Sequence, residues 1–185
     1  MFYCVGLDWL VLFLKKPKMS GTRIPKVLFF AIVLAAIAQC VHDFPLLPDR
    51  LASHFSASGM PNGWMTKTQF LVMYGVVLLP ALAIEFWVSH RIANKPDGRL
   101  NLPNKEYWLA PERRAETFAY FEIFFAWYGC VFLFVAVFAM GLAMRANFDT
   151  PPQLPTGPIV SDIAGFVLFN VVAVIAMFRR FSMPE

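Results

Sequence analysis

The longest apolar run of the chain places it in a membrane. Residues 117–144 read TFAYFEIFFAWYGCVFLFVAVFAMGLAM, 28 residues in which Glu122 is the one charged side chain. A helix needs about 20 residues to cross roughly 30 Å of hydrocarbon. The run therefore predicts a transmembrane helix with about two turns to spare.

Three more apolar stretches accompany this run. The first stretch is short, but it can span the membrane if Lys26 extends its side chain to the interface. Glu85 interrupts the second stretch, and Asp162 lies near the start of the fourth. We therefore predict one membrane domain, residues 19–185, with four spans. The spans are expected at about residues 24–44, 70–88, 117–144 and 159–178.

The composition agrees with this interpretation. Hydrophobic residues make up 58% of the 185 and charged residues 15%, whereas globular chains average roughly 45–50% and about 25%. The mean hydropathy is +0.58. A soluble chain of this size cannot bury so much apolar surface, so a soluble enzyme is excluded. The predicted fold class is an all-α integral membrane protein with four transmembrane helices.

The basic residues predict an orientation. In a four-span arrangement 13 of the 16 lie on one side of the membrane, and the other three are Arg50, Lys67 and Arg145. Because lysine and arginine are retained in the cytoplasm, both termini are predicted to be cytoplasmic. The net charge of +4 is then a topology signal, and no nucleic-acid partner is expected.

The N-terminal segment, residues 1–18, is apolar up to residue 14 except for Asp8 and ends in KKPK. It lacks the basic start and the cleavage site of a signal peptide, and it is too short to span a bilayer. A short interfacial helix is the preferred interpretation. The alternative is that Met19 is the natural first residue.

Several local signals mark element boundaries. Thr66 and Gln69 have the spacing of a capping box at the start of the second span. Residues 61–63, Pro-Asn-Gly, have the residue types of a turn. Pro111 suits the first position of the third helix, and Pro80 is expected to kink the second.

Two loop stretches carry a family resemblance. Residues 47–67 read LPDRLASHFSASGMPNGWMTK, and residues 101–113 read NLPNKEYWLAPER. Both resemble segments of SdpI-like bacterial membrane proteins, the family of the sporulation-delaying-toxin immunity protein, which contain domain of unknown function 1648. The residues that carry the resemblance are Asp49, Arg50, His54, Phe55, Gly59, Trp64, Lys67, Pro103, Tyr107, Trp108 and Arg113.

The resemblance covers roughly residues 27–140 and implies a single-domain member of that family in the bacterial inner (cytoplasmic) membrane. The chain has no room for the additional C-terminal helices of the immunity protein itself. The family has no agreed chemistry, so fold and location follow from the resemblance more directly than activity does.

The first external loop is predicted to be a lid or a docking surface. His42, Asp43, Asp49 and His54 lie within 13 residues, but none of them has the helical spacing of a strong metal motif, so no metal site is predicted. We expect His54 to hydrogen-bond the loop backbone. Phe55 and Trp64 are expected at the membrane surface.

Glu85 and Glu122 are predicted intramembrane carboxylates at similar depth. A charge within a span is a functional hypothesis by default. The two carboxylates could share a proton, as in a small proton-coupled transporter, because one raises the pKa of the other. The alternative is pairing with basic residues at the interface.

The third span carries aromatic side chains around its whole circumference, which favours helix packing and contact with lipid. The alternative is a flat surface for a partner helix, a carotenoid or a tetrapyrrole. No histidine lies at mid-membrane depth to ligate a haem, so no cofactor is predicted. Gly129, Gly141 and Gly165 are candidate sites of close helix contact.

No nucleotide, zinc or hydrolase motif is present, and the chain is predicted not to be an enzyme. The first hypothesis is a non-catalytic multi-pass protein of SdpI-like regulatory or immunity type that binds in or on the membrane. The alternatives are an accessory subunit of a respiratory or photosynthetic complex, and the proton-coupled transporter. The expected partners are the lipid bilayer and other membrane proteins.

Overall fold

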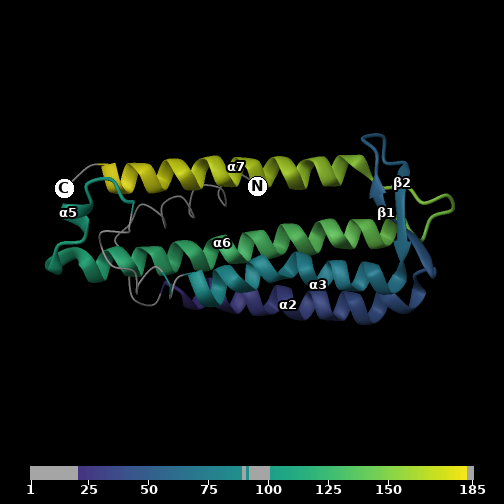
Figure 1. Cartoon of the computed structure of the whole chain (residues 1–185), viewed down its shortest axis with the longest axis horizontal. Helices are drawn as coiled ribbons and strands as arrows, with labels where there is room; N and C mark the ends of the chain where they lie inside the picture. Colours follow the sequence, from purple (N-terminus) through teal and green to yellow (C-terminus); the bar gives the residue numbers. More distant parts are fainter. Residues whose placement is uncertain (1–20, 89–90, 92–100, 183–185) are drawn as a thin grey trace, which may run out of the picture.

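A computed structural model describes residues 21–88, 91 and 101–182 (Figure 1). Within these residues, four helices are long and apolar enough to cross a membrane, which confirms the four predicted spans. They are α2 (Arg23–Asp43), α3 (Lys67–Ala83), α6 (Pro111–Ala146) and α7 (Thr156–Ser182). The predicted interfacial helix at residues 1–18 lies outside the described residues.

Shorter elements extend or join these helices. The 3-10 turn η1 (Phe44–Leu46) continues α2, the π-helical turn η2 (Ile84–Val88) continues α3, and the short helix α5 (Lys105–Trp108) precedes α6. Pro80 lies inside α3, four residues before the π-helical turn begins. The predicted boundaries at Thr66 and Pro111 are confirmed, because Thr66 and Gln69 form a capping box and Pro111 opens α6.

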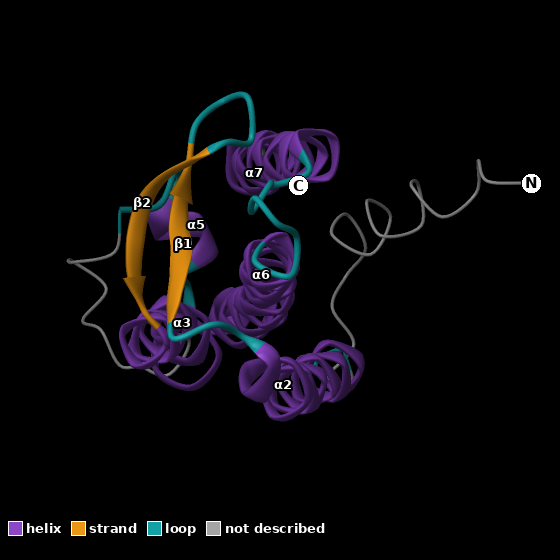
Figure 2. Cartoon of the chain, turned by 90° about the vertical axis from the view of Figure 1, so that its right-hand side faces the viewer, coloured by secondary structure: helices purple, strands orange, loops and turns teal. Residues whose placement is uncertain are grey.

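Helix α6 is the central helix of the bundle. It packs against α2 and α3 on one side and against α7 on the other, as the two views show (Figures 1 and 2). In its most apolar window 39% of the residues are buried, against 17% in α2, 17% in α3 and 11% in α7. The other three helices therefore turn most of their surface outward, as expected for helices surrounded by lipid.

Side chains of α6 contribute to three buried clusters along its length. Phe29 of α2, Ala81 of α3 and Leu133 of α6 meet near the middle. Phe121 and Phe124 pack on α7 around Phe181, which is fully buried. The aromatic density of this helix therefore serves packing between α6 and α7. Phe134 and Phe138 are exceptions, at 53% and 40% exposed.

Two of the three predicted glycine contacts are present. An ideal Cβ on Gly129 would lie 3.4 Å from Ile84 Cγ2 and from Glu85 Oε2, and one on Gly141 would collide with the Gln39 amide. Gly165 instead faces open space, with no atom within 4 Å of such a Cβ. Among the glycines of the described helices, close contact with another helix is thus made by the two in α6.

The all-α prediction is wrong at one end of the bundle, which carries a two-stranded antiparallel sheet. Strand β1 (Arg50–Phe55) pairs with β2 (Pro61–Thr66), from Arg50 opposite Thr66 to Phe55 opposite Pro61. We call this sheet with its turn the hairpin and this side of the bundle the hairpin end. The opposite side, with α5, is the α5 end.

The predicted Pro-Asn-Gly turn is also wrong, since residues 61–63 belong to strand β2. The chain reverses one step earlier, where Ser56 N–H donates to the Met60 carbonyl at 2.8 Å and Gly59 N–H donates to the Ser56 carbonyl at 2.9 Å. Gly59 has φ +80°, a conformation open to glycine at little cost. Proline is tolerated at position 61 because it occupies the first residue of its strand.

We predict that Gly129→Leu destabilises the bundle and that Gly165→Leu does not. The added side chain at position 129 must displace Ile84 or Glu85, whereas at position 165 it enters open space. Overpacking of this kind costs about 1–3 kcal/mol. Thermal unfolding of both variants in the same detergent measures the difference. An equal loss of stability in the two variants would contradict the close contact of α6 with α3.

Candidate functional site

The hairpin lies across the end of the helix bundle (Figure 2). Its inner face is apolar, because Leu51 is fully buried in a cluster with Phe70 and Tyr74 of α3 and Met144 of α6. The hairpin is thereby packed on two of the spanning helices. Three polar contacts then fix its position.

The first contact is made by Lys67, one of the predicted site residues. Its Nζ donates to the Pro45 carbonyl at 3.1 Å and to the Leu47 carbonyl at 2.9 Å, and it lies 4.9 Å from the centre of the Phe44 ring. A cation here satisfies carbonyls that the end of a helix leaves unpaired. Lys67 therefore joins the end of α2 and η1 to the start of α3.

The second contact is made by Asn147, which the sequence interpretation missed. Its side-chain Oδ1 accepts from Ala52 N–H at 2.6 Å, and its Nδ2 donates to the Ala52 carbonyl at 2.9 Å. The same Nδ2 donates to the Ala143 carbonyl at 2.9 Å. Asn147 is 6% exposed, so its amide pairs with the edge of β1 away from solvent, in the place of a third strand. An asparagine just after a span gives no local signal for such a distant partner.

The third contact joins Gly59 to the segment that connects α6 and α7. Leu154 N–H donates to the Gly59 carbonyl at 2.9 Å. A Cβ on residue 59 would collide with the Leu154 carbonyl, so this position excludes a side chain on steric as well as conformational grounds. Gly59 and Lys67 are therefore positioning residues of the hairpin.

Other residues of the resemblance remain on the surface of the hairpin. His54 is exposed, and its Nδ1 is hydrogen-bonded to Asn62 Oδ1 at 2.8 Å, so the expected bond to loop backbone is instead a bond between side chains. Trp64 is 46% exposed and Met60 48%. Phe55 is half-buried opposite Pro61. The hairpin thus presents an aromatic ring and polar groups on a fixed scaffold.

Asp49 and Arg50 are exposed at the start of the hairpin, and the Asp49 backbone carbonyl accepts from Lys67 N–H at 2.9 Å. His42 and Asp43 form a neighbouring pair, with Nδ1 and Oδ1 2.7 Å apart. Among the residues that the structure describes, no three histidine, cysteine or acidic side chains are grouped to hold a metal ion.

The two predicted carboxylates are not brought together. Glu85 is 9% exposed and faces Gly129, while Glu122 is exposed on α6, roughly 10 Å further along that helix. Lys26 of α2 and Cys130 of α6 are the charged and thiol groups that interact electrostatically with Glu85. Glu85 Oε2 has no hydrogen-bond partner among the described residues. Glu85 is therefore a single buried carboxylate and not half of a pair.

The second stretch of the resemblance holds the α5 end of the bundle together. Trp108 Nε1 donates to the Phe181 carbonyl at 2.9 Å, and the Trp108 carbonyl accepts from Thr117 Oγ1 at 2.8 Å. Asn104 Nδ2 donates to the carbonyls of Phe181 at 3.0 Å and Ser182 at 3.1 Å. The donors lie in the segment before α6, and they satisfy the terminal carbonyls of α7.

Charged groups close the same end. Arg180 Nη2 donates to Glu116 Oε1 at 2.6 Å, and its guanidinium lies 4.9 Å from the centre of the Trp108 ring. The Arg113 guanidinium lies 3.9 Å from the centre of the Tyr107 ring. Pro103, another residue of the resemblance, is exposed. Trp108 therefore joins α5 to α7, and Arg113 joins α6 to α5 through Tyr107. Sequence reasoning singled them out but missed Asn104 and Arg180.

Comparison with known proteins adds one family to this picture of a four-helix membrane protein with a hairpin at one end. Residues 28–84 match the family model described as "Domain of unknown function (DUF1648)". The match runs from α2 through the hairpin to the end of α3, so it supports the resemblance to that domain. No curated protein and no solved structure matches the chain.

We predict that Asn147→Ala loosens the hairpin. The substitution removes both partners of the Ala52 backbone, which is fully buried, and an unsatisfied buried group costs about 1–3 kcal/mol. Protease cleavage of the hairpin in detergent is expected to accelerate at least tenfold.

The matched control is Asn62→Ala, which removes an exposed hydrogen bond to His54 and is expected to change the cleavage rate little. Equal rates in wild type and Asn147→Ala would contradict the anchoring role of Asn147.

Proposed function

We propose that the chain is a non-catalytic, SdpI-like regulatory or immunity protein of the bacterial inner membrane and that the hairpin binds its partner. The observation that carries this proposal is the hairpin itself. Its buried residues fix it to the bundle, and its surface presents Trp64, Met60 and the His54–Asn62 pair. A rigid scaffold with an exposed tryptophan suits binding, because aromatic anchors supply most of the affinity of many interfaces.

The distribution of basic residues supports an outward-facing hairpin. Arg50, Lys67 and Arg145 belong to the hairpin end. Lys67 donates a hydrogen bond to the Pro45 carbonyl, and Arg50 lies opposite Thr66 in the hairpin. The remaining basic residues of the sequence belong to the other side in the four-span arrangement. By the positive-inside rule the termini are then cytoplasmic, and a toxin or signal arriving from outside meets the hairpin first.

The two alternatives have less support. The hypothesis of a proton-coupled transporter rests on a carboxylate pair, and Glu122 is exposed away from Glu85. An accessory subunit of a respiratory or photosynthetic complex would bury one lipid-facing side of the bundle, and α7, with 11% of its window buried, is the helix best suited to such a contact.

The orientation is tested with single cysteines in a chain carrying Cys4→Ser, Cys40→Ser and Cys130→Ser. We expect a membrane-impermeant maleimide to label Met60→Cys in intact cells and to label Lys105→Cys after the cells are opened. Both positions lie outside the spanning helices, so access depends on the side of the membrane alone. Labelling of position 105 in intact cells would contradict the proposed orientation.

The binding role is tested with Trp64→Ala in a bacterial host sensitive to sporulation-delaying toxin. We expect the wild-type chain to increase survival and the variant to lose about tenfold or more of that protection, because an interface tryptophan is a common hot spot. The matched control is Trp87→Ala, which removes another exposed tryptophan, 55% against 46% for Trp64, from the turn after α3.

Equal protection by Trp64→Ala and wild type would contradict the docking role of the hairpin. A wild-type chain that is inserted but gives no protection would contradict the immunity role. The amount of each variant in the membrane, measured by immunoblot, separates both results from a failure to insert.

A further inference from the structure

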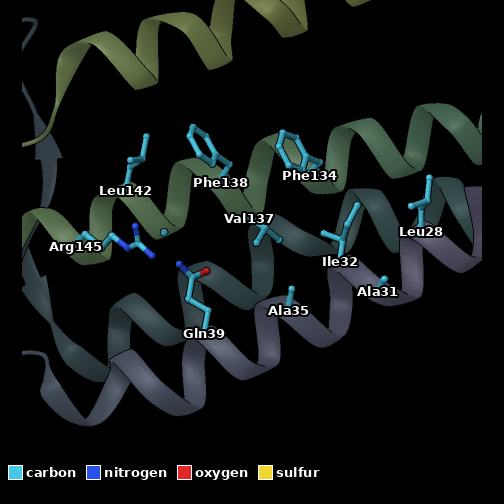
Figure 3. A pocket seen from close by; sticks show the side chains of 11 residues that line it. Leu28, Ala31, Ile32, Ala35, Gln39, Phe134, Val137, Phe138, Leu142 and Arg145 are labelled. Atoms are coloured by element: carbon cyan, nitrogen blue, oxygen red, sulfur yellow. The ribbon is translucent and has the colours of Figure 1, made fainter. Parts of the chain in front are cut away.

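A groove of about 400 Å³ runs between α2 and α6 (Figure 3). From α2 it is lined by Leu28, Ala31, Ile32 and Ala35, and from α6 by Phe134 and Phe138 among others. The rings of Phe134 and Phe138 are stacked, with centroids 6.0 Å apart and an angle of 11° between their planes, and they form one wall of the groove. The small Ala31 and Ala35 leave space opposite this wall.

The length of the groove corresponds to one leaflet of a membrane. It extends from Leu28 to Gln39 on α2 and from Phe134 to Arg145 on α6, about 16 Å at 1.5 Å per residue. Half of a hydrocarbon core roughly 30 Å thick is about 15 Å. The groove is therefore long enough for an acyl chain of one leaflet, and it ends at the hairpin end.

The hairpin end of the groove is polar. Gln39 and Arg145 point toward one another there, and the Gln39 amide rests against Gly141 (Figure 3). Arg145 is exposed, and within the described part of the chain no carboxylate forms an ion pair with it. A guanidinium at this depth is a strong site for a phosphate because it can donate two parallel hydrogen bonds.

Arg145 also lines a second pocket, of about 420 Å³, which lies toward the hairpin. Its other lining residues include Ser58, Asp149, Gln153 and Thr156. The apolar groove and the polar pocket thus meet at one arginine. Asp149 places a carboxylate beyond that arginine, so the order along the path is apolar, cationic and anionic.

We propose that the groove and the pocket bind one phospholipid with a phosphoethanolamine head group from the leaflet at the hairpin end. One acyl chain lies between α2 and α6, the phosphate contacts Arg145, and the ammonium group faces Asp149. The charge order of the site matches this zwitterionic head group. An anionic lipid such as phosphatidylglycerol would satisfy Arg145 but leave Asp149 beside an uncharged group.

A transmembrane helix fits the groove less well than an acyl chain. An apolar helix laid along it would cover Arg145 and Gln39 without satisfying them, and a buried unpaired charge is costly. An acyl chain fills the apolar part and brings its own phosphate to the arginine. Lipid binding at this site is independent of the partner proposed for the hairpin.

The test is native mass spectrometry of the purified protein with dioleoyl phosphatidylethanolamine or dioleoyl phosphatidylglycerol. We expect the wild-type protein to bind phosphatidylethanolamine more tightly. Ala35→Leu fills the groove and is expected to weaken this binding about tenfold, as is Arg145→Gln. Because Ala35 is exposed, its replacement leaves the packing of the bundle intact. The matched control is Ala38→Leu, which changes an exposed alanine of α2 outside the groove and is expected to bind as wild type does.

The head-group assignment is tested with Asp149→Asn, which is expected to reduce the preference for phosphatidylethanolamine while keeping the affinity for phosphatidylglycerol. Unchanged binding by Ala35→Leu would overturn the groove as the site of the acyl chain. Equal binding of both lipids by the wild type would overturn the role of Asp149. Loss of a dimer in Ala35→Leu, in place of loss of lipid, would show that a second copy of the chain occupies the groove and would also overturn the proposal.

Discussion

The close packing of three helices on α6 is the constraint on which the rest of the structure depends. Within hydrocarbon, apolar side chains gain little by moving from lipid to protein, so helices associate through close van der Waals contact and a few polar bonds. Helix α6 allows such contact with α2 and α3 at Gly141 and Gly129, where a side chain would intrude. On its other side, Tyr128 donates from its hydroxyl to Asn170 Oδ1 at 2.7 Å and so links α6 to α7 within the membrane.

Polar bonds at the two ends of the bundle complement this packing. At the hairpin end Asn147 and Lys67 satisfy backbone groups of β1 and of the chain after α2. At the α5 end Asn104 and Trp108 satisfy the last carbonyls of α7. A helix end leaves several backbone groups unpaired, and side chains of a distant segment supply the missing partners in each case. The segments between the spans are therefore structural parts of the bundle.

The sequence predicted the spanning helices because their signal is the composition of a continuous run, which no distant contact can override in lipid. It did not predict the hairpin, because strand β2 begins with Pro61, Asn62 and Gly63, which are typical of turns, and its β-branched content is limited to Thr66 at its end. The strands depend on Asn147, far along the chain. Similarly, the sequence predicted Glu85 and Glu122 at similar depth, but Glu85 faces Gly129, roughly 10 Å along α6 from Glu122. Their relative depth and their opposite burial depend on how the helices are shifted and rotated against one another.

The residues singled out by the resemblance divide into two kinds once the contacts are known. Gly59 and Lys67 hold the hairpin in place, while Trp64 and His54 lie on its surface. Ser58 connects this surface to the polar pocket beside Arg145, because it belongs to the hairpin turn and also lines that pocket. A molecule in that pocket therefore touches the turn whose conformation Gly59 fixes. The surface proposed to bind a partner and the polar pocket thus share one turn, at Ser58 and Gly59.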